Sequence, residues 1–429
     1  MSTAPLKPQN LPETLIWYYI IGTYLIYYLG AQYVLAQLLA FFLTLYLIQQ
    51  WWNQTEETPL DERISISPSV WVWIVAVLVL ESATAVSHYN FDMGLKRFIE
   101  TSVAWSRTWA LFALFPLVGH LKIRPKLIYR AICILCLQSL VIVIIGSLAG
   151  LIHLPNITYI SPLGSLPLNG GIKQYEVYLF HNPINERLQL FAPWPPALGV
   201  TSNIYFFLVL QEQNKKWRWI SIVSIIAMIV GSVSRTAIIC LPFVVLFVWA
   251  VTNLLRPWVQ FVAGGISFLS GIYLPTLIEF LKASIEELKK ARAKSSKTRD
   301  ALERIAVHRW ETEAPIWGHG LSEPGPPWVA RMPIGTHHTW FGLLFTHGLV
   351  GCVAFATALA WSFIDLLIKA QSSENARVGL KIILVLIIFS FSEHLDGSVY
   401  VFWPGLVMLG IAFKEGQALH HYPKMQSIT

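Results

Sequence analysis

The stretch PIWGHGLSEPGPPWVARMPIGTHHTWFGLLFTHGLVG, residues 315–351, changes character halfway along its length. Its first part is rich in Gly and Pro, and the chain then passes through His337 and His338 into a mostly apolar run. Backbone that is not helical and lies near a bilayer must be shielded by protein or water. We therefore expect this segment to be an ordered part of a functional site, with its imidazoles where water meets lipid.

The rest of the chain has the composition of a polytopic membrane protein. Of 429 residues, 55% are hydrophobic, 13% are charged and 18 are tryptophans. A helix needs about 20 apolar residues to cross a bilayer. About twelve runs qualify if short and tilted spans are allowed, at residues 15–29, 34–51, 70–86, 103–121, 127–151, 197–210, 219–233, 236–255, 259–281, 339–368, 378–391 and 399–413. We predict an all-α membrane fold, with a turn around Gly348 and Gly351 in the longest span.

The basic residues predict how these spans are oriented. Lys and Arg gather in alternate connections, which is the bias of cytoplasmic loops, so the formal net charge of +7 requires no nucleic acid partner. We expect both termini in the cytoplasm and no cleaved signal peptide. Residues 282–297 are a basic exception in an outside loop, and they fit either anionic lipid headgroups or an anionic lipid-linked substrate.

Two outside connections are long, at residues 153–196 and 282–337. The apolar spacing at the start of the second permits amphipathic helices at the membrane interface, and Pro315 ends that helical pattern. The predicted organisation is therefore about nine transmembrane helices in residues 1–281, a large periplasmic loop at 282–337, and the last spans with a cytoplasmic tail at 338–429.

Histidines are the candidate catalytic residues. With an ordinary pKa near 6.5, a histidine accepts a proton from a sugar hydroxyl at neutral pH. His337 and His338 open a helix at the membrane surface and are predicted to be catalytic, although an interfacial histidine is often structural. His347 and His394 are weaker candidates.

Arginines are the candidate ligands for phosphate. Arg235 lies in a very short outside connection, where a guanidinium is costly unless it is paired, snorkels to the interface or faces a water-filled cavity. The fork of an arginine suits a phosphate group. Arg299, Arg304 and Arg309 lie on successive turns of one predicted helix, and Arg187 ends the first outside loop. We expect some of these side chains to converge on a pyrophosphate.

Other polar residues are assigned structural roles. Cys133 and Cys136 form a C-x-x-C inside an apolar run, without a nearby histidine or second cysteine pair, and are expected to be core residues. Glu81 and Arg107 lie in adjacent spans and are predicted to form a buried ion pair. No phosphate-loop, dinucleotide or zinc-protease motif occurs, and no acidic cluster suggests Mg²⁺, so we expect no metal and no cofactor.

The segment from Arg187 to Gly351 resembles the O-antigen ligase and polymerase superfamily of bacterial membrane glycosyltransferases. In that pattern an Arg heads a helix, a Pro-x-x-Gly-x-Gly turn follows, and a His usually followed by Asn opens a membrane helix. Arg299, residues 315–320 and His337 are similar to these parts. Residues 234–236, Ser-Arg-Thr, resemble the family's Ser-Arg-Gly, and residues 187–196 resemble its Arg-x-x-Gly-x-Phe-x-x-Pro-Asn more loosely. The chain departs from the pattern at His338, Thr236 and the Trp-Pro-Pro of residues 194–196.

The resemblance implies a GT-C-like fold in the bacterial inner membrane and an inverting, metal-independent glycosyltransferase. Its donor would be a glycan on a polyprenyl diphosphate such as undecaprenyl diphosphate, and its acceptor a lipopolysaccharide core, another lipid-linked repeat or a protein. Arg235 and Arg299, with Arg187 and Arg309, would hold the pyrophosphate, and His337 would activate or orient the acceptor hydroxyl. Tryptophans that offer faces for sugar rings, or form an aromatic belt instead, are Trp310, Trp317, Trp328 and Trp340.

Two functions from other classes remain open at this point. One is a transporter of the inorganic-carbon type, which should place functional polar residues at the membrane midplane. The other is a non-catalytic component of a polysaccharide export system.

Overall fold

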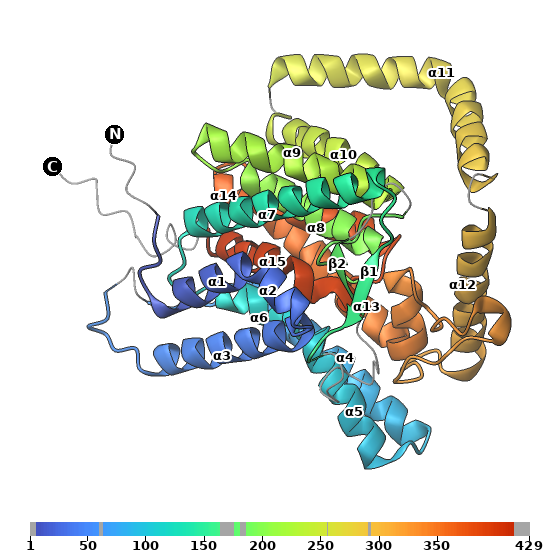
Figure 1. Cartoon of the computed structure of the whole chain (residues 1–429), viewed down its shortest axis with the longest axis horizontal. Helices are drawn as coiled ribbons and strands as arrows, with labels where there is room; N and C mark the ends of the chain where they lie inside the picture. The colour runs from blue at the N-terminus through green and yellow to red at the C-terminus, as the bar shows by residue number, and fades with distance from the viewer. Residues whose placement is uncertain are drawn as a thin grey trace.

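The computed structural model describes residues 6–59, 63–163, 176–180, 186–254, 256–290 and 293–415, without the side chains of 176, 180, 275–277, 280–290 and 293–296. The predicted cytoplasmic ends are therefore largely outside the described residues, as are the middle of the first outside loop and most side chains of the basic segment 282–297. The described chain is mostly helical (Figure 1), which confirms the predicted all-α class.

Seven helices in the described part are long and apolar enough to cross a membrane. They are α3 (Gln32–Trp52), α4 (Pro68–Asn90), α7 (Pro125–Leu151), α10 (Arg235–Thr252), the first part of α11 (Pro257–Lys290), α13 (Thr339–Lys369), and α15 (Val399–Lys414) with the 3₁₀ turn before it (Asp396–Ser398). Shorter helices complete the bundle, namely α1 (Leu11–Ile21), α2 (Thr23–Tyr28), α5 (Gly94–Arg107), α6 (Leu111–Val118), α8 (Pro195–Val209), α9 (Lys215–Ser232) and α14 (Glu374–Ser390). The chain is a multi-pass membrane protein, and the number of about twelve spans stays a prediction.

Two of the predicted spans are broken. The run at residues 15–29 is divided between α1 and α2 at Gly22, whose ψ of 5° departs from the helix. The prediction of a single span at 103–121 is wrong, because α5 ends at Arg107 and Thr108 adopts φ −122° and ψ −88°. Apolar periodicity did not reveal this break, since both sides of it are hydrophobic.

A small antiparallel hairpin, which the sequence did not predict, covers one end of the bundle. It pairs β1 (Ile157–Ile160) with β2 (Glu176–Phe180) in the first long loop. The hydroxyl of Tyr28 in α2 donates to the carbonyl of Leu179, which holds the hairpin on the helices.

The core of the bundle is made of aromatic side chains that join helices far apart in the sequence. Trp73 of α4 stacks on Phe112 with ring centroids 5.7 Å apart, and its indole N–H donates to Ser362 of α13 over 2.9 Å. Phe115 and Trp403 stack at 5.0 Å and join α6 to α15. Cys133 and Cys136 are buried in α7, as expected for core residues.

The predicted ion pair between Glu81 and Arg107 is not formed. The hydroxyl of Ser102 donates to the Glu81 carboxylate, whereas Arg107 donates to the side-chain oxygen of Gln37 and lies 5.7 Å over the ring of Tyr33. The reason is that α5 is a short amphipathic helix and not the middle of a span, so Arg107 points towards α3.

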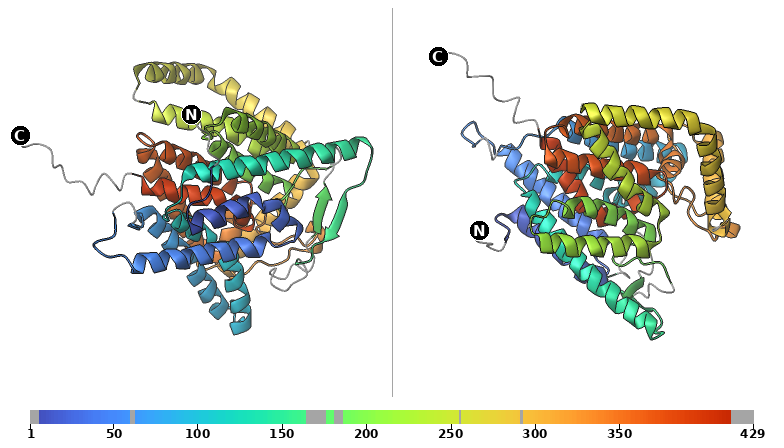
Figure 2. Two further views of the ribbon diagram at one scale, coloured as in Figure 1. Left: turned by 60° about the vertical axis from the view of Figure 1, so that its left-hand side comes forward. Right: turned by 90° about the horizontal axis from the view of Figure 1, so that it is seen from above.

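Helices α11 and α12 (Ala293–Glu313) run along the outside of the bundle in Figures 1 and 2, and α12 returns the chain to the start of α13. Ala306 of α12 packs with Ile334 and Phe345 in a small separate core. Helix α12 ends at Glu313, so the prediction that Pro315 ends this helical segment is confirmed.

The Gly-rich segment after α12 is joined to α13 by a ladder of backbone hydrogen bonds. The N–H groups of residues 319 and 320 donate to the carbonyls of 345 and 346, and those of 349 and 350 donate to the carbonyls of 315 and 316. Gly348 breaks α13 between them with φ +62° and ψ −161°. The predicted turn in this span is thereby confirmed, and its cause is the segment that lies against it.

Candidate active site

The candidate site begins with the turn that leads into α13. Gly335, at φ +80°, packs so closely on the backbone of Gly342 that a Cβ atom would lie 2.7 Å from the Gly342 Cα. His337 also has a left-handed backbone, at φ +72°, and His338 is the extended N-cap residue of α13. These conformations direct adjacent imidazoles to different surroundings.

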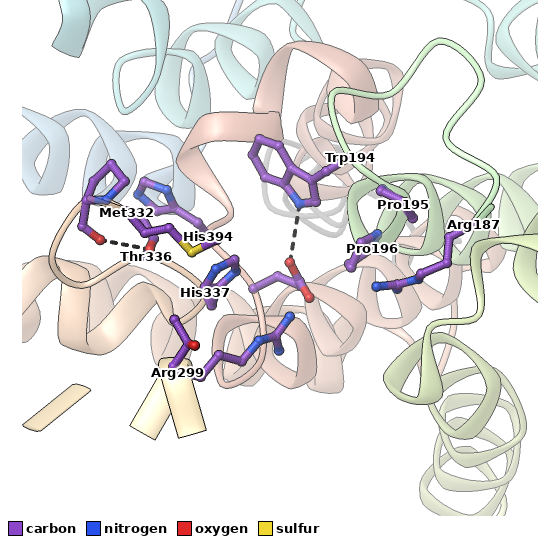
Figure 3. Close-up of a pocket in the computed structure, with 12 residues that line it drawn as sticks. Arg187, Trp194, Pro195, Pro196, Arg299, Met332, Thr336, His337 and His394 are labelled. Atoms are coloured by element: carbon purple, nitrogen blue, oxygen red, sulfur yellow. Dashed lines mark hydrogen bonds between the residues drawn. The ribbon is translucent and has the colours of Figure 1, made fainter. Parts of the chain in front are cut away.

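The connection between α14 and α15 lies against this turn. The Thr339 hydroxyl donates to the Glu393 carbonyl over 2.6 Å and accepts from the Leu395 N–H over 3.2 Å. On the opposite side, the indole N–H of Trp194, just before α8, donates to the Glu393 carboxylate over 3.3 Å (Figure 3). Three distant parts of the sequence thus position Glu393, which is buried.

A cavity of about 670 Å³ opens between these elements. His337, Glu393, His394 and Trp194 line it together with Arg187 and Arg299, as Figure 3 shows. Arg299 enters from α12 and lies below His337 in that view, whereas Arg187 enters from the side of α8. The structure therefore unites two of the predicted phosphate ligands with one of the predicted catalytic histidines.

Arg187 is fixed to the connection between α9 and α10. Its Nε donates to the carbonyl of Ser232 over 2.9 Å, and the adjacent Leu188 N–H donates to Gly231. Arg235 follows on the same connection as the first residue of α10, after the N-cap Ser234. It is half-buried beside the wall that carries Arg187, but it is not among the lining residues.

The other candidates on α12 and α13 face elsewhere. Arg309 forms ion pairs with Glu313 at 2.7 Å and Glu323 at 2.6 Å, and these carboxylates raise its pKa. It joins α12 to the Gly-rich segment and lies outside the cavity. His338 packs its ring on Phe341 with centroids 4.3 Å apart and does not line the cavity either.

Burial and nearby charges together determine the protonation of the titratable side chains in the cavity. Burial, helped by the nearby charges of Arg299 and His394, lowers the pKa of His337 to about 4, so its imidazole is neutral at pH 7. Burial raises the pKa of Glu393 to about 7, although the two arginines oppose this. Burial by itself would lower the pKa of His394. The carboxylates of Asp396, whose Oδ1 lies 2.7 Å from His394 Nε2, and of Glu393 have the larger opposite effect, so the pKa of His394 is raised. The cavity contains groups that accept or release a proton near neutral pH.

A second cavity of about 400 Å³ meets the first at Thr336 and His394, which line both. Its far wall is α5, which contributes Arg97, Glu100 and Trp105. Threonine and serine hydroxyls line much of the remainder. A chamber lined by hydroxyl and charged groups as well as apolar side chains can hold a hydroxyl-bearing molecule next to the first cavity.

The tryptophans predicted for sugar contacts are not at this cavity. Trp310 and Trp340 direct their indole N–H groups to the carbonyl of Pro315 and the hydroxyl of Ser390, and Trp328 is exposed. The indole that does line the cavity is Trp194, where the chain departs from the family pattern. The sequence pattern identified His394 only as a weaker candidate and assigned no role to Glu393. The signal that could have found them is Ser-Glu-His-Leu-Asp at 392–396, a polar cluster between two apolar runs.

The comparison with protein families matches residues 220–356 to the O-antigen ligase family. No curated protein matches the chain. The matched segment contains Arg235, Arg299 and His337, so the resemblance predicted from these residues is confirmed. It indicates a glycan-transfer function in polysaccharide synthesis. Arg187, Trp194 and Glu393 lie outside the matched segment and join the site only in three dimensions.

Proposed function

From the O-antigen ligase domain at residues 220–356, we propose that this protein transfers a glycan from a polyprenyl diphosphate to an acceptor hydroxyl on the outer face of the bacterial inner membrane. The observation that carries this proposal is the cavity in which Arg187 and Arg299 face His337 and Glu393. Two cations, a neutral imidazole and a carboxyl group that titrates near neutrality suit transfer from an anionic leaving group.

The arginines act on the donor. As the acceptor oxygen forms a bond to the anomeric carbon, the bond from that carbon to the diphosphate oxygen breaks and the diphosphate leaves with the electron pair. Guanidinium groups stabilise the developing negative charge without rearrangement, because they are held in place before the reaction. Arg299 and Arg187 supply this charge from two walls of the cavity. Attack from the side opposite the leaving group inverts the anomeric centre and requires no metal.

The histidine acts on the acceptor. A neutral imidazole accepts a hydrogen bond from the attacking hydroxyl and orients it, and the imidazole takes up the hydroxyl proton as the new bond to the anomeric carbon forms and the diphosphate leaves. His337 is in this neutral form at pH 7. The acceptor saccharide occupies the second cavity, whose hydroxyl-rich wall meets the donor chamber at Thr336 and His394. The acceptor hydroxyl then reaches His337 from a side that the donor does not fill.

The test uses the purified full-length protein with an undecaprenyl diphosphate glycan and candidate acceptors. The His337→Ala and Arg299→Gln variants should each lower the transfer rate about 100-fold or more, since each removes a group that acts in the transition state. EDTA should leave the rate unchanged.

The matched controls are His308→Gln and Arg304→Gln. Both residues are exposed on α12 and lie outside the cavity, so their variants should retain the wild-type rate. Full transfer by folded His337→Ala and Arg299→Gln proteins would refute the proposed roles, and an absence of glycan transfer with every donor and acceptor would refute the function.

A further inference from the structure

An aromatic side chain, Trp194, lines the candidate active-site cavity, and the local sequence sets its position. Trp194 is the extended N-cap residue of α8, with φ −156° and ψ 159°, and Pro195 and Pro196 begin the helix after it. A proline fixes its own φ and favours an extended conformation for the residue before it. The Trp-Pro-Pro sequence, which departs from the family pattern, therefore places the indole at a defined point on the cavity wall.

The indole of Trp194 is held at both of its ends. Its N–H donates to the buried carboxylate of Glu393 over 3.3 Å (Figure 3). Its six-membered ring lies against Gly397, where a Cβ atom would come 3.0 Å from Cη2 of the indole. Trp194 is only half-buried, so part of the ring stays accessible from the cavity. A side chain that is already fixed loses little conformational freedom when a ligand packs on it.

Apolar side chains from two elements extend this surface. Pro195 and Pro196 continue the lining from α8, and Met332 and Pro333 continue it from the Gly-rich segment. A lining that is mostly apolar, with a few polar groups that fix orientation, is the usual form of a site for a small ligand. The steps assigned to the arginines and the histidine make no use of this apolar part.

In the proposed reaction a sugar ring occupies the space beside Trp194. Arg187 and Arg299 hold the diphosphate and His337 meets the acceptor hydroxyl, so the first sugar of the donor lies between them. The indole borders the same space, because it is bonded to Glu393. The carbonyl of Glu393 accepts a 2.6 Å hydrogen bond from Thr339, two residues after His337. The indole and the imidazole of His337 are thus on adjoining walls.

We propose that Trp194 is the platform for the first sugar of the donor, the pyranose bonded to the diphosphate, whose C–H face stacks on the indole. This inference rests on the proposed function. The hydrogens on one face of a pyranose carry a partial positive charge, which the negative face of an aromatic ring attracts. Stacking fixes the plane of the sugar and directs its anomeric carbon towards the acceptor. Trp194 thereby selects donors by their sugar, and not by the diphosphate or the polyprenyl chain.

Donor binding by the full-length protein in detergent tests this proposal. The probes are undecaprenyl diphosphate and the same lipid carrying glucose, galactose or N-acetylglucosamine, and native mass spectrometry gives the dissociation constants. Trp194→Leu should weaken the tightest sugar-bearing probe about tenfold, as expected for one aromatic contact, and change undecaprenyl diphosphate by less than about twofold. Trp194→Phe keeps an aromatic face without the N–H and should stay within about threefold of wild type for both.

The matched control is Trp328→Leu, which removes an exposed indole outside the cavity and should leave the binding of every probe unchanged. Circular dichroism of each variant confirms that it is folded. Equal losses of both kinds of probe in Trp194→Leu would assign Trp194 to the structure of the site, and wild-type binding of the sugar-bearing probes would show that it does not touch the sugar. Either result would overturn the proposal and leave the transferase function intact. A folded wild type that binds none of the probes would refute the proposed function as well.

Discussion

Glu393 is the residue whose environment most clearly differs from that of an ordinary carboxylate. It is buried between Trp194 and the start of α13, with two arginines across the cavity. Burial raises its pKa from 4.5 to about 7, so the folded protein holds a proton that the unfolded chain has already released. An ionised Glu393 carboxylate would repel the anionic donor of the proposed function, and protonation removes that repulsion.

The Glu393→Gln variant should reveal this proton in the stability of the protein. Because the folded pKa is raised, unfolding of wild type releases a proton between about pH 4.5 and 7, and its stability falls as pH rises through that range. The free energy of unfolding of the glutamine variant should not show this decrease, which in wild type is on the order of 3 kcal/mol. Thermal unfolding in detergent at pH 5 and pH 8 measures the difference.

The comparison between the two pH values is internal to each protein, so a general loss of stability in the variant does not affect it. Parallel unfolding midpoints of wild type and variant at both pH values would contradict a raised pKa for Glu393. The Glu311→Gln variant, on exposed α12, serves as a control and should follow wild type.

At the scale of elements, the Gly-rich segment and the break in α13 form one structural unit. The break at Gly348 leaves backbone groups of α13 without hydrogen-bond partners inside the helix. The Gly-rich segment supplies those partners, with N–H groups for the carbonyls before Gly348 and carbonyls for the N–H groups after it. A Cβ at Gly348 would lie 2.3 Å from the carbonyl oxygen of Ile316, and the residue has φ +62°. This unit holds the turn before α13 in register, and with it His337.

The Gly348→Ala variant should destabilise the protein and reduce transfer. Gly348 has φ +62° and ψ −161°, a conformation that is essentially restricted to glycine and costs a residue with a Cβ about 1–3 kcal/mol, and the overlap with Ile316 adds to that cost. The thermal midpoint should fall by several degrees. Gly264→Ala in α11 is the matched control, because nothing lies within 4 Å of its Cβ position. In a helix that change is neutral or stabilises by up to about 1 kcal/mol. Equal midpoints for the two variants would show that the break does not depend on glycine.

At the scale of the whole molecule, the two described ends differ in chemistry. The hairpin and α12 lie on the same side of the bundle in Figure 1, and residues of α12 line the candidate active-site cavity. A separate cavity at the other end is lined by residues of α1, α3 and α15. Such a division suits an enzyme that meets its lipid-linked substrates on one side of a membrane. The predicted orientation, with α12 outside, follows from the basic residues alone.

Cysteine labelling in intact cells tests this orientation. A membrane-impermeant maleimide should label Glu311→Cys on α12 without disruption of the membrane, and Lys216→Cys at the start of α9 only after permeabilisation. Both positions are exposed. The natural cysteines make a low background, since three are buried and Cys352 is partly buried. The reverse labelling pattern would invert the topology and place the candidate active site in the cytoplasm.

The sequence by itself determined the class of the protein and indicated the centre of its candidate site. Composition alone indicates a membrane bundle, because apolar helices of sufficient length satisfy their own backbone hydrogen bonds in lipid. The Gly-rich segment and His337 were recognisable because their spacing is local: each lies within one turn or at one helix start. The turn at Gly348 was predicted for the same reason. Arg299 was expected to head its helix, but α12 begins at Ala293 and Arg299 lies in its second turn.

Only the tertiary structure decided which distant residues share the site. Glu393, His394 and Trp194 reach His337 through contacts between α8, α13 and the α14–α15 connection, and no local pattern encodes those contacts. The fold also separates candidates that spacing had grouped. Arg299 and Arg309 are ten positions apart on one helix, yet Glu313 and Glu323 bind Arg309 while Arg299 faces the cavity. Packing between elements, which depends on the whole chain, selects one side chain from a series that looks equivalent in the sequence.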